Sequence, residues 1–431
     1  MALAVFLIVF FVMFALGYPI AFAMVFGGFV YFIMSGVRLA NFTDLMAIQV
    51  QAKDVLLAVP MFILAANIMN DSDITNKIFD FVKKALGPIR GGLAYANVVT
   101  SIIFAGMSGS EIADVAGVGN IEIKAMMEGG YDGPFSCAVT CASATIGPII
   151  PPSIPMVIYA MLSGASVGYL FLAGFLPGLL LGGLEMGLVY YLSRKRNYPV
   201  GQRMPFRGLL RSFIISFPGL LAPILLLGGI YGGVFTPTEA AGVVVLYVLV
   251  LSLFVYRSLG FKKLYSIMMK TVQNIGYISF MIAAAFVVSY VMCREQVPVF
   301  LTEAFMNMGL LSSKWLLLLS TNVLLFVLGM FFDVSAISLV VIPILLPLVQ
   351  AVGIDLVHFG LVTTMNLMMA LDTPPYGQTG FITSAISGTP VRDVFREMLR
   401  YWIPVEVLGL LIVTYWPDFV LWVPRILGYQ G

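Results

Sequence analysis

Two short polar segments interrupt long apolar runs, and their side chains are of the types that bind small cations. The first segment surrounds Ser108, Gly109 and Ser110, and the second surrounds Asp333. An acidic side chain at membrane depth is energetically costly and is a functional candidate by default. We expect each segment to be the tip of a hairpin that enters a membrane and turns back.

Two further apolar runs each contain a proline pair in mid-run. A proline inside a helix removes a hydrogen bond and costs about 3 kcal/mol or more, so each pair predicts a broken helix. The residues that precede the pairs are Gly147, Pro148 and Ile149 in the first break, and Asp372 and Thr373 in the second. Carbonyls freed at a break can coordinate a hard cation, and the N–H groups that open the following half-helix favour an anion.

Sodium is the cation that these ligands fit best, because neutral oxygens with one carboxylate roughly balance a single charge. Magnesium and calcium normally recruit more carboxylates. We predict one sodium ion between the tip 108–110 and the break 147–149. We predict a second between Asp333 and the break at Asp372 and Thr373, so two or more transported ions are expected. The residues expected to contact a substrate are Ser110, Ser153, Asp333 and Gln378.

Other polar residues have two readings each. Glycine and serine in membrane helices often serve only to let helices approach closely. Glu111 and Asp114 belong either to the site or to a solvated face of the hairpin. Glu239 is either a helix-cap carboxylate or a gating residue. Glu185 and Glu406 are expected to pair locally or to lie near an interface.

The composition requires lipid as the solvent for most of the surface. Of the 431 residues, 60% are hydrophobic and only 10% are charged, whereas a soluble domain carries about 25% charged residues. Each span must satisfy its backbone internally as a helix, which predicts an all-α polytopic membrane protein. The formal net charge of +2 gives no strong field to attract nucleic acid, and we expect none to bind.

The hydropathy pattern predicts about 11–12 helical spans of about 20 apolar residues each. The candidates run over 2–16, 19–35, 55–70, 93–106, 133–161, 167–193, 213–232, 237–256, 272–292, 314–331, 355–385 and 402–423. The stretches 107–128 and 332–350 predict re-entrant hairpins, which a membrane accepts only where protein or water covers the backbone. Basic clusters at 194–211 and 257–270 lie two spans apart, which places both on the cytoplasmic side.

A repeat relates the two halves of the chain at one constant offset. Gly106 falls on Gly329, and the proline pair 151–152 falls on the pair 374–375. We therefore expect two repeats of inverted topology, whose paired interruptions are typical of the binding site of a secondary transporter. The predicted units are 1–54 with N-terminal scaffold helices, 55–193 with hairpin 107–128 and broken helix 133–161, 194–271 with basic loops and linking scaffold helices, and 272–423 with hairpin 332–350 and broken helix 355–385.

Three motifs in combination resemble the large membrane subunit of tripartite ATP-independent periplasmic (TRAP) transporters, most of all the sialic-acid members. They lie at 104–110, 145–153 and 235–241, and the resemblance covers essentially the whole chain. It implies an elevator-type transporter of the bacterial inner membrane, in which sodium drives uptake of a carboxylate such as sialic acid or a C4-dicarboxylate. It also implies two partners, a small four-helix membrane subunit and a periplasmic substrate-binding protein. No arginine lies in the breaks, so hydroxyls, backbone N–H groups and half-helix dipoles are expected to bind the carboxylate.

Two other classes of function remain open at this point. Asp333 and Asp372 lie in late spans, as the carboxylates of an intramembrane aspartyl protease would, but the GxGD-type context is absent. A passive channel would predict rings of polar residues on continuous helices rather than duplicated breaks. Uptake into proteoliposomes that needs a sodium gradient distinguishes the transporter from both.

Overall fold

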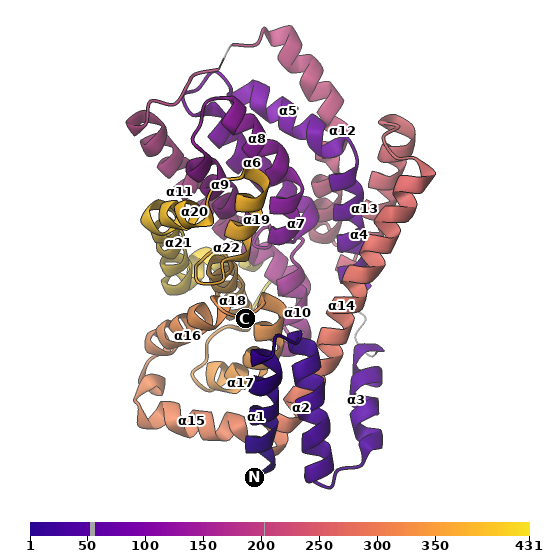
Figure 1. The fold of residues 1–431 in the computed structure, drawn as a ribbon, viewed down its shortest axis with the longest axis vertical. Coiled ribbons are helices and arrows are strands. Elements are labelled where there is room, and N and C mark those ends of the chain that lie inside the picture. Colours follow the sequence, from indigo (N-terminus) through magenta and orange to yellow (C-terminus); the bar gives the residue numbers. More distant parts are fainter. Residues whose placement is uncertain (52–56, 202) are drawn as a thin grey trace.

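The computed structural model describes residues 1–51, 57–201 and 203–431, and its regular structure is helical (Figure 1). Within these ranges the only β-type pairing is an isolated bridge between Arg90 and Val200. The boundary predicted between residues 54 and 55 lies outside the described residues. The helices up to the basic loop are α1 (Ala2–Ala15), α2 (Ile20–Met34), α3 (Leu39–Gln51), α4 (Ala58–Asp71), α5 (Ile74–Leu86), α6 (Gly92–Ser108), α7 (Glu111–Ala116), α8 (Val118–Glu128), α9 (Gly133–Ala144), α10 (Ile154–Ser163) and α11 (Val167–Lys195).

The remaining helices continue to the carboxyl terminus, with three short non-α turns among them. They are α12 (Phe206–Tyr231), α13 (Pro237–Val250), η2 (Leu251–Val255), α14 (Phe261–Arg294), α15 (Val297–Asn307), η3 (Leu310–Ser312), α16 (Lys314–Gly329), α17 (Val334–Ala351), α18 (Leu356–Leu371), α19 (Gln378–Ser387), α20 (Val391–Glu397), η4 (Met398–Trp402), α21 (Ile403–Tyr415) and α22 (Pro417–Ile426).

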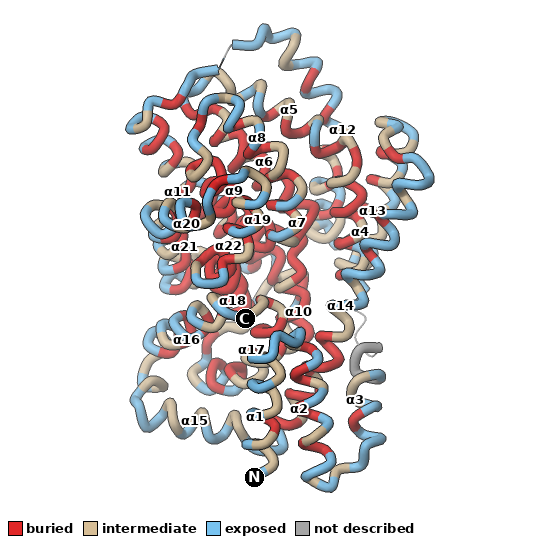
Figure 2. The backbone as a smooth tube through the Cα atoms, viewed as in Figure 1, coloured by how far each residue is buried: buried red, intermediate tan, exposed pale blue. Residues whose placement is uncertain are grey.

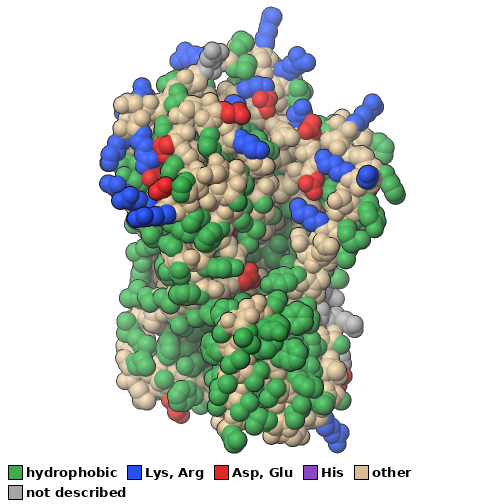
Figure 3. Space-filling model, in the orientation of Figure 1, with side chains coloured by type: hydrophobic (Ala, Val, Ile, Leu, Met, Phe, Trp, Pro, Cys, Tyr) green, Lys and Arg blue, Asp and Glu red, His purple; other side chains and the backbone are tan. Residues whose placement is uncertain are grey.

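The helices have the lengths and apolarity of a membrane protein. Within the described residues, six helical stretches are each long and apolar enough to cross a bilayer, and seven shorter helices are also apolar. Lys and Arg side chains gather at the end of the molecule where α5 and α12 lie, as expected for a cytoplasmic side (Figure 3). The fold class predicted from the sequence, an all-α polytopic membrane protein, is confirmed.

Each re-entrant hairpin is longer than the sequence predicted. In the first, Gly109 turns the chain at φ +61° between α6 and α7, so the predicted stretch 107–128 is only its second arm. In the same way, 332–350 is the second arm α17, whose first arm is α16. The candidate spans 93–106 and 314–331 are these first arms. An apolar run has the same composition whether it faces lipid or protein, and most of α6 is buried in protein, so composition alone did not separate the two cases.

Each broken helix consists of two helices joined by a non-helical link that contains the proline pair. α9 ends at Ala144 and α10 begins at Ile154, whereas α18 ends at Leu371 and α19 begins at Gln378. At the constant offset, α6 to α10 correspond to α16 to α19 in order. The two hairpins enter from opposite ends of the molecule, α6 near the end with α5 and α16 near the end with α15 (Figure 1).

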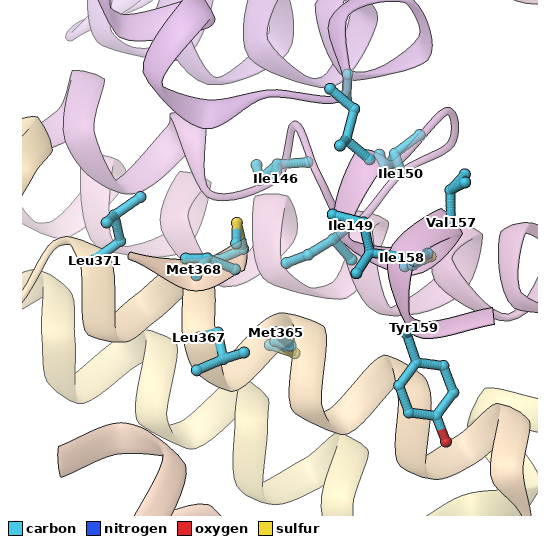
Figure 4. Close-up of a cluster of buried hydrophobic side chains, with 14 of the residues drawn as sticks. Ile146, Ile149, Ile150, Val157, Ile158, Tyr159, Met365, Leu367, Met368 and Leu371 are labelled. Carbon is cyan, nitrogen blue, oxygen red and sulfur yellow. The ribbon is translucent and has the colours of Figure 1, made fainter. Parts of the chain in front are cut away.

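The two repeats are interleaved. α10 of the first repeat packs on α17, the second hairpin arm of the other repeat, and α19 packs on α7 and α8, which are the corresponding arm. The first repeat also packs on α18, as Figure 4 shows, where Ile149 of the break and Ile158 of α10 lie over Met365 and Met368. All four side chains are at most 2% exposed. Since lipid is as apolar as these side chains, close van der Waals packing stabilises the contact.

For description we divide the helices into two groups, which also contact each other, as α14 does α17 and α4 does α6. One group, here called the scaffold, includes α2, α3, α4, α13 and α14, which pack on one another, with α12 joining α13 to α5. The other, here called the core group, contains α6 to α11 and α16 to α22. The core group holds the densest buried region, whereas the outer helices of the scaffold are largely exposed on their outer faces (Figure 2).

Candidate functional site

The first hairpin tip packs directly on the first break. A Cβ added to Gly109 would lie 2.5 Å from the carbonyl oxygen of Pro152, and the residue's φ of +61° also favours glycine. The N–H of Ile154 donates to the carbonyl of Gly109 over 3.5 Å. Tip and break are therefore held in contact, with Ser108 buried beside them.

A carboxylate that the sequence left open, Asp114 of α7, lies at this junction. The residue is 4% exposed, and neither carboxylate oxygen has a hydrogen-bond partner in the part of the chain that the structure describes. Ser108 is its polar neighbour. A Cβ added to Gly147 would lie 2.6 Å from Asp114 Oδ2, so only glycine lets the carboxylate reach the break. The reading of Asp114 as part of a solvated face is wrong, because α7 packs between the core helices.

The sodium ion expected at this junction stays a prediction. Asp114 places a carboxylate beside the break, and Ser108 places a hydroxyl beside the tip. A bare carboxylate away from water is strongly disfavoured, so it must hold a proton or a cation. The hydroxyl of Ser110 is used differently, since it accepts a 3.4 Å hydrogen bond from the N–H of Ala113 and caps α7.

Two residues predicted as ligands in the first break lie differently. The carbonyl oxygen of Ile149 lies against α11, where it would be 2.1 Å from a Cβ added to Gly174. Its side chain belongs to the apolar cluster of Figure 4. No hydrogen bond joins Pro148 or Ile149 to the tip among the described residues, so their role as ligands stays a prediction.

A cavity of about 420 Å³ lies between the hairpin tips and the scaffold. Its core side is lined by Ser108 and Ser110 from the first tip and by Asp333 and Ser335 from the second. The two tips thus meet at one cavity, although they lie more than 200 residues apart in sequence. Asp333 also caps α17, since its Oδ1 accepts a 2.9 Å hydrogen bond from the N–H of Ser335.

The scaffold side of this cavity was missed by the sequence reasoning. α4 contributes Asn67, Asn70 and Asp71, and α14 contributes Lys270, Asn274, Tyr277 and Ile278. The signal was present in the spacing, because polar residues three or four apart share one face of a helix. Composition gave no sign, however, that these two faces meet the hairpin tips.

Asp372 lies in a different setting from Asp333. It is fully buried at the end of α18, where its Oδ1 accepts a hydrogen bond from the hydroxyl of Thr379. Its acidic neighbours are Glu111 and, further away, Glu185 and Glu406. No hydrogen bond joins it to Asp333 within the described residues, so a shared sodium site of these two aspartates stays a prediction.

The glutamates near Asp372 are all buried, at 0–2% exposure, and their carboxylate oxygens have no hydrogen-bond partner among the described residues. None of them forms an ion pair there with Lys or Arg. The reading of Glu111 as solvated is therefore wrong, and no hydrogen bond or ion pair supports local pairing of Glu185 or Glu406 among the described residues; their position relative to the membrane interface stays a prediction. Each lies on a helix of the core group, α7, α11 or α21, facing protein.

The remaining predicted residues lie near the breaks but do not line the cavity. Ser153 is buried and caps α10 by accepting a 3.3 Å hydrogen bond from the N–H of Met156. Thr373 donates to the carbonyl of Met369 over 2.8 Å. Gln378 is half-buried as the first residue of α19. Their roles toward ions or substrate stay predictions.

Glu239 is a helix cap. Its Oε2 accepts hydrogen bonds from the N–H and the hydroxyl of Thr236 at 2.8 and 2.9 Å, which completes a capping box at the start of α13. The motif at 235–241 is therefore explained by local structure, and the geometry supplies no gate here.

Comparison with known proteins gives consistent matches over nearly the whole chain. The family model described as "Tripartite ATP-independent periplasmic transporter, DctM component" matches residues 7–419. The chain is 37% identical to the sialic acid TRAP transporter large permease protein SiaM of Vibrio cholerae over 414 residues, which is 96% of each chain. It is 39% identical to the C4-dicarboxylate TRAP transporter large permease protein DctM of Pseudomonas aeruginosa over 373 residues, 86% of this chain and 87% of that one.

A third relative and a solved structure complete the comparison. The sialic acid TRAP transporter permease protein SiaT of Haemophilus influenzae is 36% identical over 426 residues, which cover 99% of this chain and 68% of that one. The crystal structure of the YdaH transporter of Alcanivorax borkumensis superposes with a TM-score of 0.64 at 16% identity, covering 88% of each chain. At that identity the likeness concerns the fold alone.

These matches confirm the resemblance to TRAP transporters that the sequence motifs indicated. They are transporters of the inner membrane, so an enzymatic role as an intramembrane protease is excluded, and the chain is an inner-membrane protein. The family works with a small membrane subunit and a periplasmic binding protein. The chain belongs to the tripartite ATP-independent periplasmic transporters and is their DctM component, the large membrane permease.

Proposed function

We propose that this permease couples the inward movement of sodium ions to the uptake of an organic acid across the bacterial inner membrane. The observation that carries the proposal is the set of buried carboxyl groups without a basic partner at the tips and breaks, among the described residues. Asp114, Asp372 and Glu111 are at most 4% exposed and form no ion pair with Lys or Arg in the described part of the chain. Cations that neutralise them have a strong reason to bind.

The charge of the cavity itself supports obligatory coupling. Among the described residues, Asp71 and Asp333 line it together with one basic residue, Lys270. An anionic substrate that enters this cavity alone would add to an existing excess of negative charge. Sodium at Asp333 and at Asp114 would remove that repulsion, so substrate and ion would each raise the affinity of the other. This reciprocity is the thermodynamic basis of symport.

The arrangement of the two helix groups supports an elevator mechanism. The tips and breaks belong to the core group, whereas the opposite wall of the cavity belongs to α4 and α14 of the scaffold. Movement of the core group past the scaffold would carry the tips, with their ions and substrate, from one side to the other. Inverted repeats with binding at broken helices are typical of such transporters.

The substrate class is an organic acid, with sialic acid (N-acetylneuraminate) as the first candidate. Two of the relatives are sialic acid systems that match 96% and 99% of this chain. A C4-dicarboxylate is the second candidate, since a relative of that kind has the higher identity of 39% over a shorter region. As partners we propose a small four-helix membrane subunit and a cognate binding protein that delivers the substrate.

The experiment is uptake into proteoliposomes that contain the permease with its small subunit. Radiolabelled N-acetylneuraminate or succinate is supplied on the loaded binding protein, with an inward gradient of sodium, of potassium or of protons. We expect accumulation only with the sodium gradient and only with the binding protein present. Equal accumulation with the potassium gradient, or without the binding protein, would refute the proposal.

A further inference from the structure

Among the described residues, the scaffold wall of the cavity carries one basic residue, Lys270, and one acidic residue, Asp71, and the place of Lys270 is well defined. Lys270 lies on α14 next to Thr271, whose hydroxyl accepts a 2.9 Å hydrogen bond from the amide of Asn67 on α4. Asn67 is 5% exposed and Thr271 is 3% exposed. This buried bond fixes α14 against α4 and so fixes the helical turn from which Lys270 projects into the cavity.

Lys270 and its neighbours form a stripe of hydrogen-bond donors. Asn274 follows one turn later on the same face of α14, and Asn67 and Asn70 lie opposite on α4, all of them lining the cavity. The core side offers mainly hydroxyl and carboxylate oxygens. The scaffold wall also carries one carboxylate, Asp71, which follows Asn70 on α4. Oxygens on the core side suit cations, whereas the Lys270 ammonium and the amide N–H groups of the scaffold wall suit a carboxylate.

The position of Lys270 differs from that of the other basic residues of its helix. Lys262 and Lys263 lie at the first turn of α14 and do not line the cavity. Lys270 is about 13 Å along the helix from Phe261, and no acidic residue pairs with it within the described part of the chain. A lysine that only marked the membrane surface would extend toward that surface, but this one faces the hairpin tips.

We propose that Lys270, together with the amide of Asn274, binds the carboxylate of the substrate, and does so only when the core group faces the cytoplasm. The inference rests on the proposed transport function. Since the stripe belongs to the scaffold, a core group that has moved to the periplasmic side leaves it behind. The substrate therefore meets this positive charge on one side of the membrane only, and the charge sets the affinity on the cytoplasmic side.

The test measures both sides of the membrane separately in proteoliposomes of the permease with its small subunit. On the cytoplasmic side, exchange is followed, and the measured quantity is the internal concentration of N-acetylneuraminate or succinate that gives half-maximal exchange. The periplasmic side is probed by uptake, as the concentration of loaded binding protein that gives half-maximal uptake. Lys270→Met should raise the internal half-saturating concentration by about tenfold to a hundredfold, because one charge-assisted hydrogen bond is lost. The concentration of loaded binding protein that gives half-maximal uptake should stay unchanged.

Matched variants separate charge from folding. Lys270→Arg should keep the internal half-saturating concentration near that of the wild type, and Lys263→Met, on the same helix but outside the cavity, should have no effect. The methyl ester of N-acetylneuraminate, which lacks the charge, should exchange equally in wild type and Lys270→Met. Equal internal values for wild type and Lys270→Met, or equal losses on both sides, would overturn the inference. Wild-type protein that moves neither probe would overturn the proposed function itself.

Discussion

Replacing Asp114 by asparagine removes one negative charge from the first tip–break junction and keeps an oxygen of similar size. Because Asp114 is 4% exposed, solvent screens its charge poorly. Two opposite unit charges about 4 Å apart interact by about 4 kcal/mol at an effective dielectric constant near 20. The amide oxygen remains as a neutral ligand, so we expect a net loss of about 2 kcal/mol in cation affinity. The half-saturating sodium concentration should therefore rise about 30-fold.

The assay is the sodium dependence of initial uptake in proteoliposomes, paired with thermal unfolding in buffers with and without sodium. A ligand that binds only the folded protein raises the melting temperature, so sodium should stabilise the wild type more than Asp114→Asn. In sodium-free buffer the variant should melt no lower than the wild type, since a buried unpaired charge has been removed. Asp73→Asn is the matched control, because Asp73 has a side chain that is 48% exposed and lies 3.9 Å from Lys77. Its effect should stay below about 0.5 kcal/mol.

An Asp114→Asn variant with the sodium dependence of the wild type would refute the reasoning. The same holds for a variant whose uptake falls while its half-saturating sodium concentration is unchanged, because that result would assign Asp114 to a later step of transport and not to cation binding.

Three further predictions concern the tips and the ions. Asp333→Asn should abolish most uptake. The protein should still assemble, because the amide oxygen can cap α17 where Oδ1 now accepts a 2.9 Å hydrogen bond from the N–H of Ser335. Uptake at the wild-type rate would remove Asp333 from the site. Gly109→Ala should lower uptake at least about tenfold, because a Cβ there would lie 2.5 Å from the Pro152 carbonyl oxygen. The control is Gly164→Ala, whose residue has φ +75° but nothing within 4 Å, and it should lose only about 1 kcal/mol of stability. Equal transport by the two variants would contradict the contact argument. Initial uptake by the wild type should depend on sodium with a Hill coefficient above one, and a hyperbolic curve would argue against two coupled ions.

The irregular elements were the most predictable part of the site. Proline pairs and small polar residues inside apolar runs have few explanations, so the breaks and the tip at Gly109 could be located from the sequence. Asp333 was identifiable because a charge between apolar arms is rare. The structure adds that Asp333 lines the same cavity as Ser110 of the other repeat, which a constant offset suggested but did not require.

The long-range part of the site was less accessible to sequence reasoning. The sequence left Asp114 open between the site and a solvated face, because a polar, charged helix such as α7 has the same composition in water and in a protein interior. Lys270 looked like one more member of a basic cytoplasmic cluster. Only the packing of α14 and α4 against the hairpin tips separates Lys270 from Lys263, and a periodic pattern within one helix carries no information on its partner helix.

The measurement that bears most directly on the account is the equilibrium accumulation of substrate against imposed sodium gradients in proteoliposomes at zero membrane potential. If unpaired carboxylates and freed carbonyls at the two tips hold the coupling ions, the ratio of internal to external substrate should rise with the sodium ratio raised to a power of about two or more. A substrate ratio that stays at one, whatever the sodium gradient, would contradict the account.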